Sequence, residues 1–152
     1  MFLLEDNSNI QLYHCSDKNH NNEIFYPKRF DGASSRAGIE SPEARICFSD
    51  NIQGCIRSIC RSIYNFELYV HQPYNPEELN IYRPTKKEVY DVDITHEIWI
   101  RQPVKMKCIG KILIYDIDNN DYEDLEISFS KSKRKEILRF YTYKYKWLNR
   151  YK

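Results

Sequence analysis

The sequence predicts an α+β fold in which most strands are antiparallel, with one early helix and one C-terminal helix. A length of 152 residues suits one domain with one sizeable core, and all six prolines fall between the apolar runs, as expected for turns and strand ends. The apolar fraction of 41% and the aromatic fraction of 14% are typical of a folded globule. We therefore expect residues 1–152 to form a single domain.

Several segments have the pattern of strands. The stretch FELYVHQ alternates between apolar and polar residues, as a half-buried strand does. The stretches IWI and CIGKILIY are rich in β-branched and aromatic residues, which suit central strands. The predicted strands are Gln11–Cys15, Arg45–Ser49, Phe66–Val70, Ile94–Arg101, Lys107–Tyr115 and Glu126–Phe129.

Two segments have apolar residues at helical spacing. After the stretch ICFSD, one apolar stripe repeats every three or four positions, at Ile52, Cys55, Ile56, Ile59 and Ile63. Asp50 is the expected N-cap of this helix, and Gln53 the expected capping-box partner. The C-terminal helix covers about 132–151, with basic residues on most of its surface and an apolar face formed by Ile137, Leu138, Tyr141, Tyr145 and Leu148.

Charge is distributed unevenly along the chain. From Lys131 to Lys152 there are nine Lys or Arg residues and one Glu, whereas YDIDNNDYEDLE (115–126) is densely acidic. Two interpretations stay open: an acidic loop of the same molecule neutralises the basic helix, or the basic helix is a docking surface for a protein or nucleic acid. Neither interpretation involves a membrane.

The acidic stretch also resembles a calcium-binding loop. Asp116, Asp118 and Asn120 occupy the first, third and fifth positions of such a loop. However, Asp121 stands where the sharp turn requires glycine, and Ile127 stands where a bidentate glutamate is required. The stretch therefore predicts a solvated hairpin loop without a metal ion.

Cysteine, histidine and hydropathy patterns exclude several classes of protein. Five cysteines without a C-x-x-C pair predict reduced, packed thiols, and four histidines lack metal-ligand spacing. The sequence contains no phosphate-binding glycine loop and no nucleophile-elbow motif. No stretch has the composition of a signal peptide or a membrane span, so we expect a soluble cytoplasmic protein without a metal cofactor.

The alternation of apolar and polar residues in the predicted strands does not explain the positions of two polar residues, His14 and Glu97. His14 ends the first predicted strand, directly ahead of a polar run. Glu97 shares a strand face with Trp99, opposite the face that carries apolar residues. A solvated histidine and a surface glutamate are one interpretation; a carboxylate at the rim of a cleft, shielded by the indole, is the other.

Three motifs, in this order, resemble those of ADP-ribosyltransferases, particularly the small bacterial members typified by rifampin ADP-ribosyltransferases. LYHCS resembles their first-strand Tyr-His motif, and RICFSDNIQGCIRSI resembles their strand that leads into a helix. THEIWIRQPVKMKCIGKI resembles their run that ends in a glycine-containing strand. The likeness covers roughly residues 10–114. It implies a single ADP-ribosyltransferase-like domain, whose two small antiparallel sheets form a cleft for NAD⁺.

The resemblance also implies roles for individual residues. The catalytic residues would be His14, which hydrogen bonds to the adenosine ribose, and Glu97, which holds the 2′-hydroxyl of the nicotinamide ribose and stabilises positive charge at C1′. Phe48 or Tyr26 would stack on nicotinamide, and Arg29, Arg36 or Arg45 would pair with the pyrophosphate. Together with His14, the implied NAD⁺-binding residues are Cys15, Ser16, Tyr26, Arg29, Arg45, Phe48 and Ser49.

The chain departs from the family pattern at several positions. Cys15 stands where the family has glycine, and the middle tyrosine of the family's triad has no secure counterpart. The rifampin enzymes use an aspartate as the acid, so Asp91 and Asp93 compete with Glu97 for this role.

Two classes of function remain. The first is a mono-ADP-ribosyltransferase that uses NAD⁺ to modify a protein, a nucleic acid or a small molecule. The second is a non-enzymatic binding protein, such as a phage or mobile-element inhibitor, that has the same fold and an eroded site.

Overall fold

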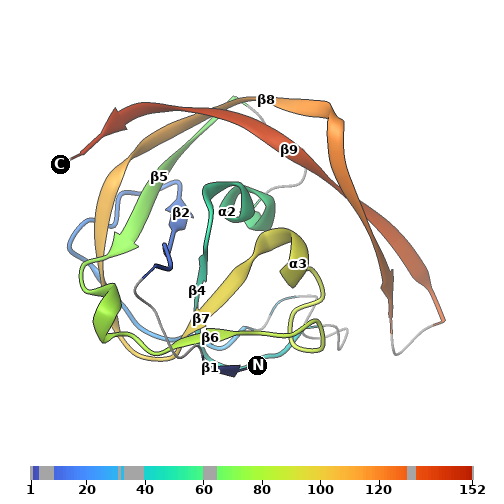
Figure 1. The fold of residues 1–152 in the computed structure, drawn as a ribbon, viewed down its shortest axis with the longest axis horizontal. Coiled ribbons are helices and arrows are strands. Elements are labelled where there is room, and N and C mark those ends of the chain that lie inside the picture. Colours follow the sequence, from blue (N-terminus) through green and yellow to red (C-terminus); the bar gives the residue numbers. More distant parts are fainter. Residues whose placement is uncertain are drawn as a thin grey trace.

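The computed structural model describes residues 2–3, 9–30, 32, 40–59, 65–129 and 133–151 of the chain. These residues form two antiparallel sheets with few helices, which agrees with the predicted α+β class (Figure 1). The first, sheet A, has the order β1 (Phe2–Leu3), β6 (Ile81–Arg83), β7 (Glu97–Ile100) and β4 (Ile46–Ser49). The second, sheet B, has the order β2 (His14–Ser16), β5 (Phe66–Pro73), β8 (Val104–Ser128) and β3 (Ile24–Phe25), and β9 (Lys135–Arg150) also pairs with β8.

Most of the predicted strands coincide with observed ones, but their bounds differ. The segment Ile94–Arg101 was expected to be one strand, yet its first residues belong to the short helix α3 (Val92–Thr95). His96 ends that helix in the left-handed conformation, at φ 55°, and the strand β7 starts at the next residue. The segment Glu126–Phe129 is no separate strand, because most of it is the far end of β8.

The early helix is confirmed as α2 (Ile52–Ile59), which buries the predicted stripe through Ile52, Cys55 and Ile56; Ile63 lies outside the described residues. The predicted cap is wrong by one position. Asn51, and not Asp50, accepts the hydrogen bond from the N–H of Gly54, at 2.6 Å. Asp50 instead accepts hydrogen bonds from the side chains of Asn51 and Arg83.

The prediction of a C-terminal helix is wrong. Residues 135–150 form the strand β9, which pairs with β8 along its whole length. Aromatic side chains such as those of FYTYKYKW suit a pleated surface, and β8 supplies the partner that the strand needs. Ile137, expected on a packed helix face, is 70% exposed.

The acidic stretch is also placed differently from the prediction, because it lies within β8 and is no hairpin loop. An irregularity in the pairing falls between Asp118 and Tyr122, where the strand carries extra residues opposite Thr142 and Tyr141. The hairpin closes further along, where the N–H of Phe129 bonds to the carbonyl of Arg134.

Cross-strand ion pairs join the acidic and basic segments. Arg139 binds Asp124 through two hydrogen bonds, of 2.8 and 3.1 Å, and Lys135 lies 3.3 Å from Glu126. Opposite charges on neighbouring strands stabilise their pairing. Neutralisation within the molecule is therefore confirmed for these residues, although it joins two strands instead of a helix and a loop.

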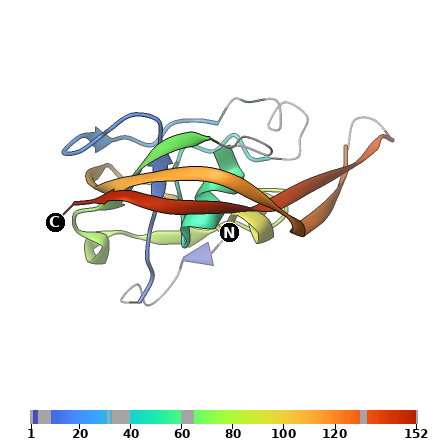
Figure 2. The same ribbon diagram turned by 90° about the horizontal axis from the view of Figure 1, so that it is seen from above.

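Helix α2 lies beneath the arch of β8 and β9 and covers the outer edge of β9 (Figures 1 and 2). The amide of Gln53 bonds both polar groups of the Tyr143 backbone, donating to its carbonyl at 2.9 Å and accepting from its N–H at 2.7 Å. Arg57 donates to the carbonyl of Tyr141 at 3.2 Å. The helix thus satisfies backbone groups that an edge strand leaves unpaired. Gln53 was predicted to complete a capping box and has this role instead.

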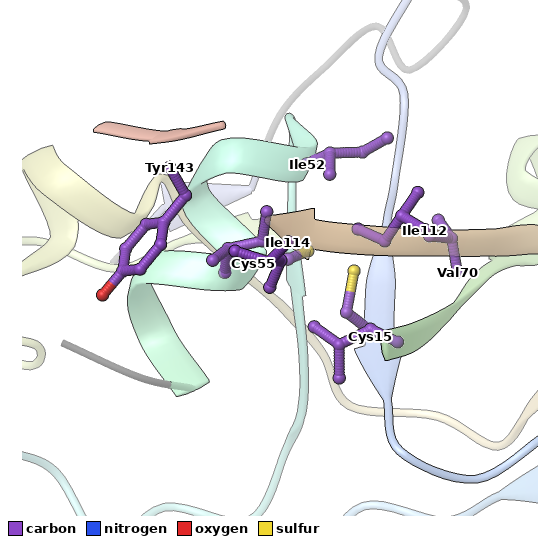
Figure 3. Close-up of a cluster of buried hydrophobic side chains, with 9 residues drawn as sticks. Cys15, Ile52, Cys55, Val70, Ile112, Ile114 and Tyr143 are labelled. Atoms are coloured by element: carbon purple, nitrogen blue, oxygen red, sulfur yellow. The ribbon is translucent and has the colours of Figure 1, made fainter. Parts of the chain in front are cut away.

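Two apolar clusters form the core. One fills the space between α2 and sheet B and contains Cys15, Ile52, Cys55, Ile56, Leu68, Val70, Ile112, Ile114 and Tyr143 (Figure 3). The other contains apolar side chains from the opposite part of the fold, including sheet A: Leu12, Ile46, Phe48, Leu79, Ile81, Ile98, Ile100, Val104 and Met106. Cys15 of the first cluster belongs to β2, and Ile46 and Phe48 of the second belong to β4; backbone hydrogen bonds between Tyr13 and Ser49 bring these two strands together.

We expect Gln53→Ala to destabilise the protein by about 1–3 kcal/mol, because it removes both hydrogen bonds that the Gln53 amide makes to the backbone of Tyr143. Urea-induced unfolding measures the change. The matched control is Gln72→Ala, since the side chain of Gln72 bonds to the exposed side chain of Gln11 and the loss of this bond should cost less than about 0.5 kcal/mol. Equal costs for the two variants would contradict the proposed role of Gln53.

Candidate functional site

A cavity of about 420 Å³ is lined by residues of both sheets, a volume within the range of pockets that bind small molecules. Six of the residues predicted from the sequence contribute to its wall: His14, Cys15, Arg45, Phe48, Ser49 and Glu97. His14 belongs to sheet B and Glu97 to sheet A, so the cavity brings together the two residues on which the sequence-based hypothesis depends.

Backbone pairing explains how these two residues come together. Tyr13, next to His14, exchanges two hydrogen bonds with Ser49, of 2.8 and 2.9 Å. Ser49 is in turn paired with Glu97 in the register of β4 and β7. One continuous set of backbone hydrogen bonds therefore connects the strand of His14 to the strand of Glu97.

Two hydrogen-bond donors bind the same carboxylate oxygen of Glu97. The indole Nε1 of Trp99 donates to Oε1 at 2.8 Å, and the thiol of Cys47 donates to Oε1 at 3.0 Å. The side-by-side placement of Glu97 and Trp99 confirms that they share a strand face. Both donors fix the orientation of the carboxylate, and Oε2 receives neither of these bonds.

Cys47 is the cavity residue that the sequence analysis missed. It is exposed, but the surface that it exposes lines the cavity, so protein atoms surround the thiol. Burial within these walls raises the pKa of Cys47, and the negative charge of Glu97 raises it further. A signal for this residue did exist: alternation in RICFS puts Cys47 on the same face as Arg45 and Ser49, both of which were predicted site residues.

The protonation state of His14 follows from its surroundings. Its Nδ1 lies 3.1 Å from the carbonyl oxygen of Cys47, which can only accept, so Nδ1 carries the proton. Burial lowers the pKa of His14, which keeps the ring neutral near pH 7. In this tautomer Nε2 is an acceptor, whereas the sequence-based hypothesis had His14 donate to a ribose hydroxyl.

A second histidine supports the strand that carries His14. The backbone N–H of His20 donates to Nε2 of His71 at 2.9 Å, so Nδ1 of His71 carries the proton and donates to the carbonyl of His14 at 3.2 Å. His71 is fully buried, and burial lowers its pKa to about 4. Within the ranges that the structure describes, no cluster of His, Cys, Asp and Glu side chains is arranged to hold a metal ion.

Arg45 has a largely structural role. Its side chain is 1% exposed and donates to the carbonyls of Ser41 and Glu43 and to the carboxylate of Glu40. The guanidinium also lies over the ring of Trp99, 4.4 Å from its centre. Its Nε, by contrast, is buried and has no partner among the described residues.

Several predicted site residues do not line the cavity. Ser16 contacts His20, at 3.1 Å, and Tyr26 is 60% exposed. Arg29 is exposed away from the cavity wall, and Arg36 lies outside the described residues.

Among the residues that do line the cavity, two are placed less favourably than predicted. Phe48 is 3% exposed and belongs to the core beneath sheet A, which leaves little of its ring for stacking on a ligand. Cys15 packs into the other apolar cluster, and its contact with Cys55 raises its pKa (Figure 3).

Asp91 and Asp93, the two alternatives to Glu97, lie in different surroundings. Asp91 lines the cavity, whereas Asp93 is on the surface and lies 2.8 Å from Lys86. The wall also includes residues to which the sequence assigned no role: Phe30, Arg57, Tyr90 and Thr95. They come from separate loops and helices, so only the fold brings them to one place.

Gly54 allows α2 to approach this wall closely. A Cβ atom at this position would lie 2.1 Å from the carbonyl oxygen of Thr95 and 2.4 Å from Oγ of Ser49. Oγ of Ser49 donates to the same carbonyl at 2.7 Å. A side chain at position 54 would therefore push apart the helix and the two strands that carry Ser49 and Glu97.

Comparisons of the chain with protein-family models, with curated proteins and with solved structures find no match. The resemblance to ADP-ribosyltransferases thus remains a prediction from short motifs. No helix among the residues that the structure describes combines the length and the apolar composition needed to cross a membrane.

We expect Gly54→Ala to destabilise the protein by about 1–3 kcal/mol, the usual cost of forcing extra atoms into a packed site. Alanine favours a helix interior by about 1 kcal/mol over glycine, so a stabilised variant would contradict the close approach described above. Thermal unfolding measures the change. Ser58→Ala, on the same helix at an exposed position, is the control and should shift stability by less than about 0.5 kcal/mol.

Stability should fall in acid partly because of His71. The pKa of His71 is about 4 in the folded protein, whereas the ordinary histidine value of 6.5 applies to the unfolded chain. Between these two pH values the unfolded chain therefore binds the proton more readily than the folded protein does. The stabilisation that neutral His71 gives to the folded state is complete above about pH 6.5 and decreases as the pH falls toward 4. The loss between pH 7.5 and pH 5 should be about 2 kcal/mol.

Urea unfolding of the protein and of His71→Gln at these two pH values measures this loss, because glutamine can donate and accept but does not titrate. His14, His20 and Glu23 also face His71, so the difference between the two proteins is the relevant quantity. An unchanged pH dependence in the variant would show that His71 is not responsible.

Proposed function

We propose that the protein is a mono-ADP-ribosyltransferase that cleaves NAD⁺ and transfers ADP-ribose to an acceptor. The observation that supports this most is the shared cavity, whose wall includes His14 from one sheet and Glu97 from the other. A pure docking surface would not require a buried carboxylate and a neutral imidazole in the same hollow. The sequence motifs point to the same pair.

In this proposal His14 binds a ribose of NAD⁺. Nδ1 is committed to the carbonyl of Cys47, and Nε2 accepts a hydrogen bond from a ribose hydroxyl. The hydrogen bond from His71 to the carbonyl of His14 fixes the backbone that carries the ring. His14 therefore positions the substrate and does not transfer a proton.

Glu97 supplies the negative charge. Trp99 and Cys47 hold Oε1, so the carboxylate is oriented before substrate binds, and Oε2 accepts the 2′-hydroxyl of the nicotinamide ribose. As the bond from C1′ to the nicotinamide nitrogen breaks, positive charge develops on the ribose. A fixed carboxylate nearby stabilises that charge, and nicotinamide leaves as a neutral molecule.

The remaining contacts to NAD⁺ differ from the sequence-based assignment. Phe30 and Tyr90 line the cavity and are half-buried, so we assign stacking on nicotinamide to one of them in place of Phe48. NAD⁺ is the substrate, and no metal takes part in the proposed reaction. The acceptor is a protein, a nucleic acid or a small molecule, and the expectation of a cytoplasmic protein belongs to the same proposal.

One observation favours the alternative, a non-enzymatic binding protein with an eroded site. The charged end of Arg45 is occupied by Glu40 and by two backbone carbonyls, so its guanidinium does not present a free pair of N–H groups to a pyrophosphate. A protein that had lost NAD⁺ chemistry could keep such an arginine for structural reasons alone.

Incubation with NAD⁺ separates these functions. The protein should release nicotinamide, and NAD⁺ should raise its melting temperature because it binds only the folded state. Glu97→Gln keeps the size of the side chain and removes its charge, so nicotinamide release should fall by roughly two to three orders of magnitude. The rise in melting temperature should change little, because the variant keeps most hydrogen bonds to the substrate.

Two further variants make the comparison specific. Asp93→Asn changes a surface carboxylate far less suited to the role and should leave nicotinamide release as it is. His14→Ala should reduce the rise in melting temperature. Absence of both nicotinamide release and a melting shift at millimolar NAD⁺ would support the binding protein, whereas full activity of Glu97→Gln would mean that another acid, such as Asp91, acts at C1′.

A further inference from the structure

We propose that Cys47 is an acceptor of ADP-ribose, so that the protein modifies its own thiol when it cleaves NAD⁺. This inference rests on the proposed function and adds an acceptor to it. The thiol of Cys47 lies 3.0 Å from Oε1 of Glu97, the carboxylate assigned to C1′ of the nicotinamide ribose. A sulfur atom in this place is close to the carbon at which the glycosidic bond breaks.

Exposure distinguishes Cys47 from the two other cysteines in the cavity wall. Cys15 and Cys55 are 7% and 4% exposed, and both pack into the apolar cluster beneath α2 (Figure 3). Cys47 is exposed, belongs to β4 and lines the cavity. Only this thiol, of the three, combines access to the cavity with contact to a carboxylate.

A second, independent observation indicates that an anionic ligand belongs next to Cys47. Nε of Arg45 is a buried donor without a partner among the described residues, and Arg45 lines the same cavity. Buried donors almost always have an acceptor, so a phosphate oxygen of a bound dinucleotide would satisfy this one. The positive charge of Arg45 also favours the ionised form of the neighbouring thiol.

The step balances without any further reactant. The bond from C1′ to the nicotinamide nitrogen breaks, and its electron pair leaves with the nitrogen. A lone pair of Sγ forms the new bond to C1′, and the thiol proton moves along the existing hydrogen bond to Oε1 of Glu97. The products are neutral nicotinamide, ADP-ribose linked through sulfur to Cys47, and a protonated Glu97.

The surroundings of Cys47 also explain why the thiol would react with NAD⁺ and not with solvent-borne electrophiles. Burial and the charge of Glu97 raise its pKa, so the free protein holds a protonated thiol, which is a weak nucleophile. Positive charge at C1′ offsets the charge of Glu97 during the reaction. The thiol therefore becomes a nucleophile only as nicotinamide departs.

The test is mass spectrometry of the full chain after incubation with NAD⁺, with nicotinamide release measured in the same samples. We expect one ADP-ribose per chain, located by peptide fragmentation on Cys47 and absent from Cys15 and Cys55. Cys47→Ser should lose the adduct. Mercury(II), which binds soft sulfur ligands, should release the ADP-ribose, whereas hydroxylamine should not.

Alkylation of the unmodified sequence gives a second measurement in case the variant does not fold. After incubation with NAD⁺, the fraction of Cys47 that denatured protein offers to iodoacetamide should fall in step with nicotinamide release. Release of nicotinamide without an adduct at Cys47 would overturn this proposal and leave the proposed function intact. Absence of nicotinamide release would overturn both.

Discussion

Two backbone hydrogen bonds between Tyr13 and Ser49, of 2.8 and 2.9 Å, join the two sheets, and the arrangement of the cavity depends on them. His14 follows Tyr13, and Glu97 is paired with Ser49, so this bridge sets how the imidazole lies relative to the carboxylate. Side chains alternate between the faces of a strand, and a shift of one residue would turn each of them away from the cavity. The site thus depends on strand register more than on any single side-chain contact.

Helix α2 connects the stability of the fold to the shape of the site. Gly54 lets the helix approach Thr95 and Ser49, while Gln53 and Arg57, one turn apart, bond to the outer edge of β9. The helix therefore protects an edge strand that would otherwise offer unpaired backbone groups to another chain. The same helix forms part of the cavity wall, so loosening of the hairpin formed by β8 and β9 would be transmitted to the residues around Glu97.

The chemistry of the site arises from shared partners. Cys47 accepts a hydrogen bond at its carbonyl from His14 and donates one from its thiol to Glu97, so one residue contacts both members of the predicted pair. Trp99 donates to the same carboxylate and stacks on Arg45, whose Nε has no hydrogen-bond partner among the described residues. Such a network holds one orientation of the carboxylate, which is what the proposed stabilisation of positive charge on a ribose would require.

The sequence by itself determined the α+β class and the helix that begins at Ile52, because alternation and helical spacing are local properties of the chain. It also singled out His14 and Glu97, which the structure places in the wall of one cavity. Only the tertiary structure decided that residues 135–150 form a strand and not a helix. Phe140 and Tyr143 are both buried and three positions apart, which imitates a helix, yet an irregularity in β8 opposite Thr142 and Tyr141 lies between their pairing positions. That spacing depends on the irregular pairing with β8, which the pattern of residues 135–150 alone does not contain. Cys47 was not predicted for the same reason, because its contacts with His14 on β2 and Glu97 on β7 arise from the fold and not from the local sequence.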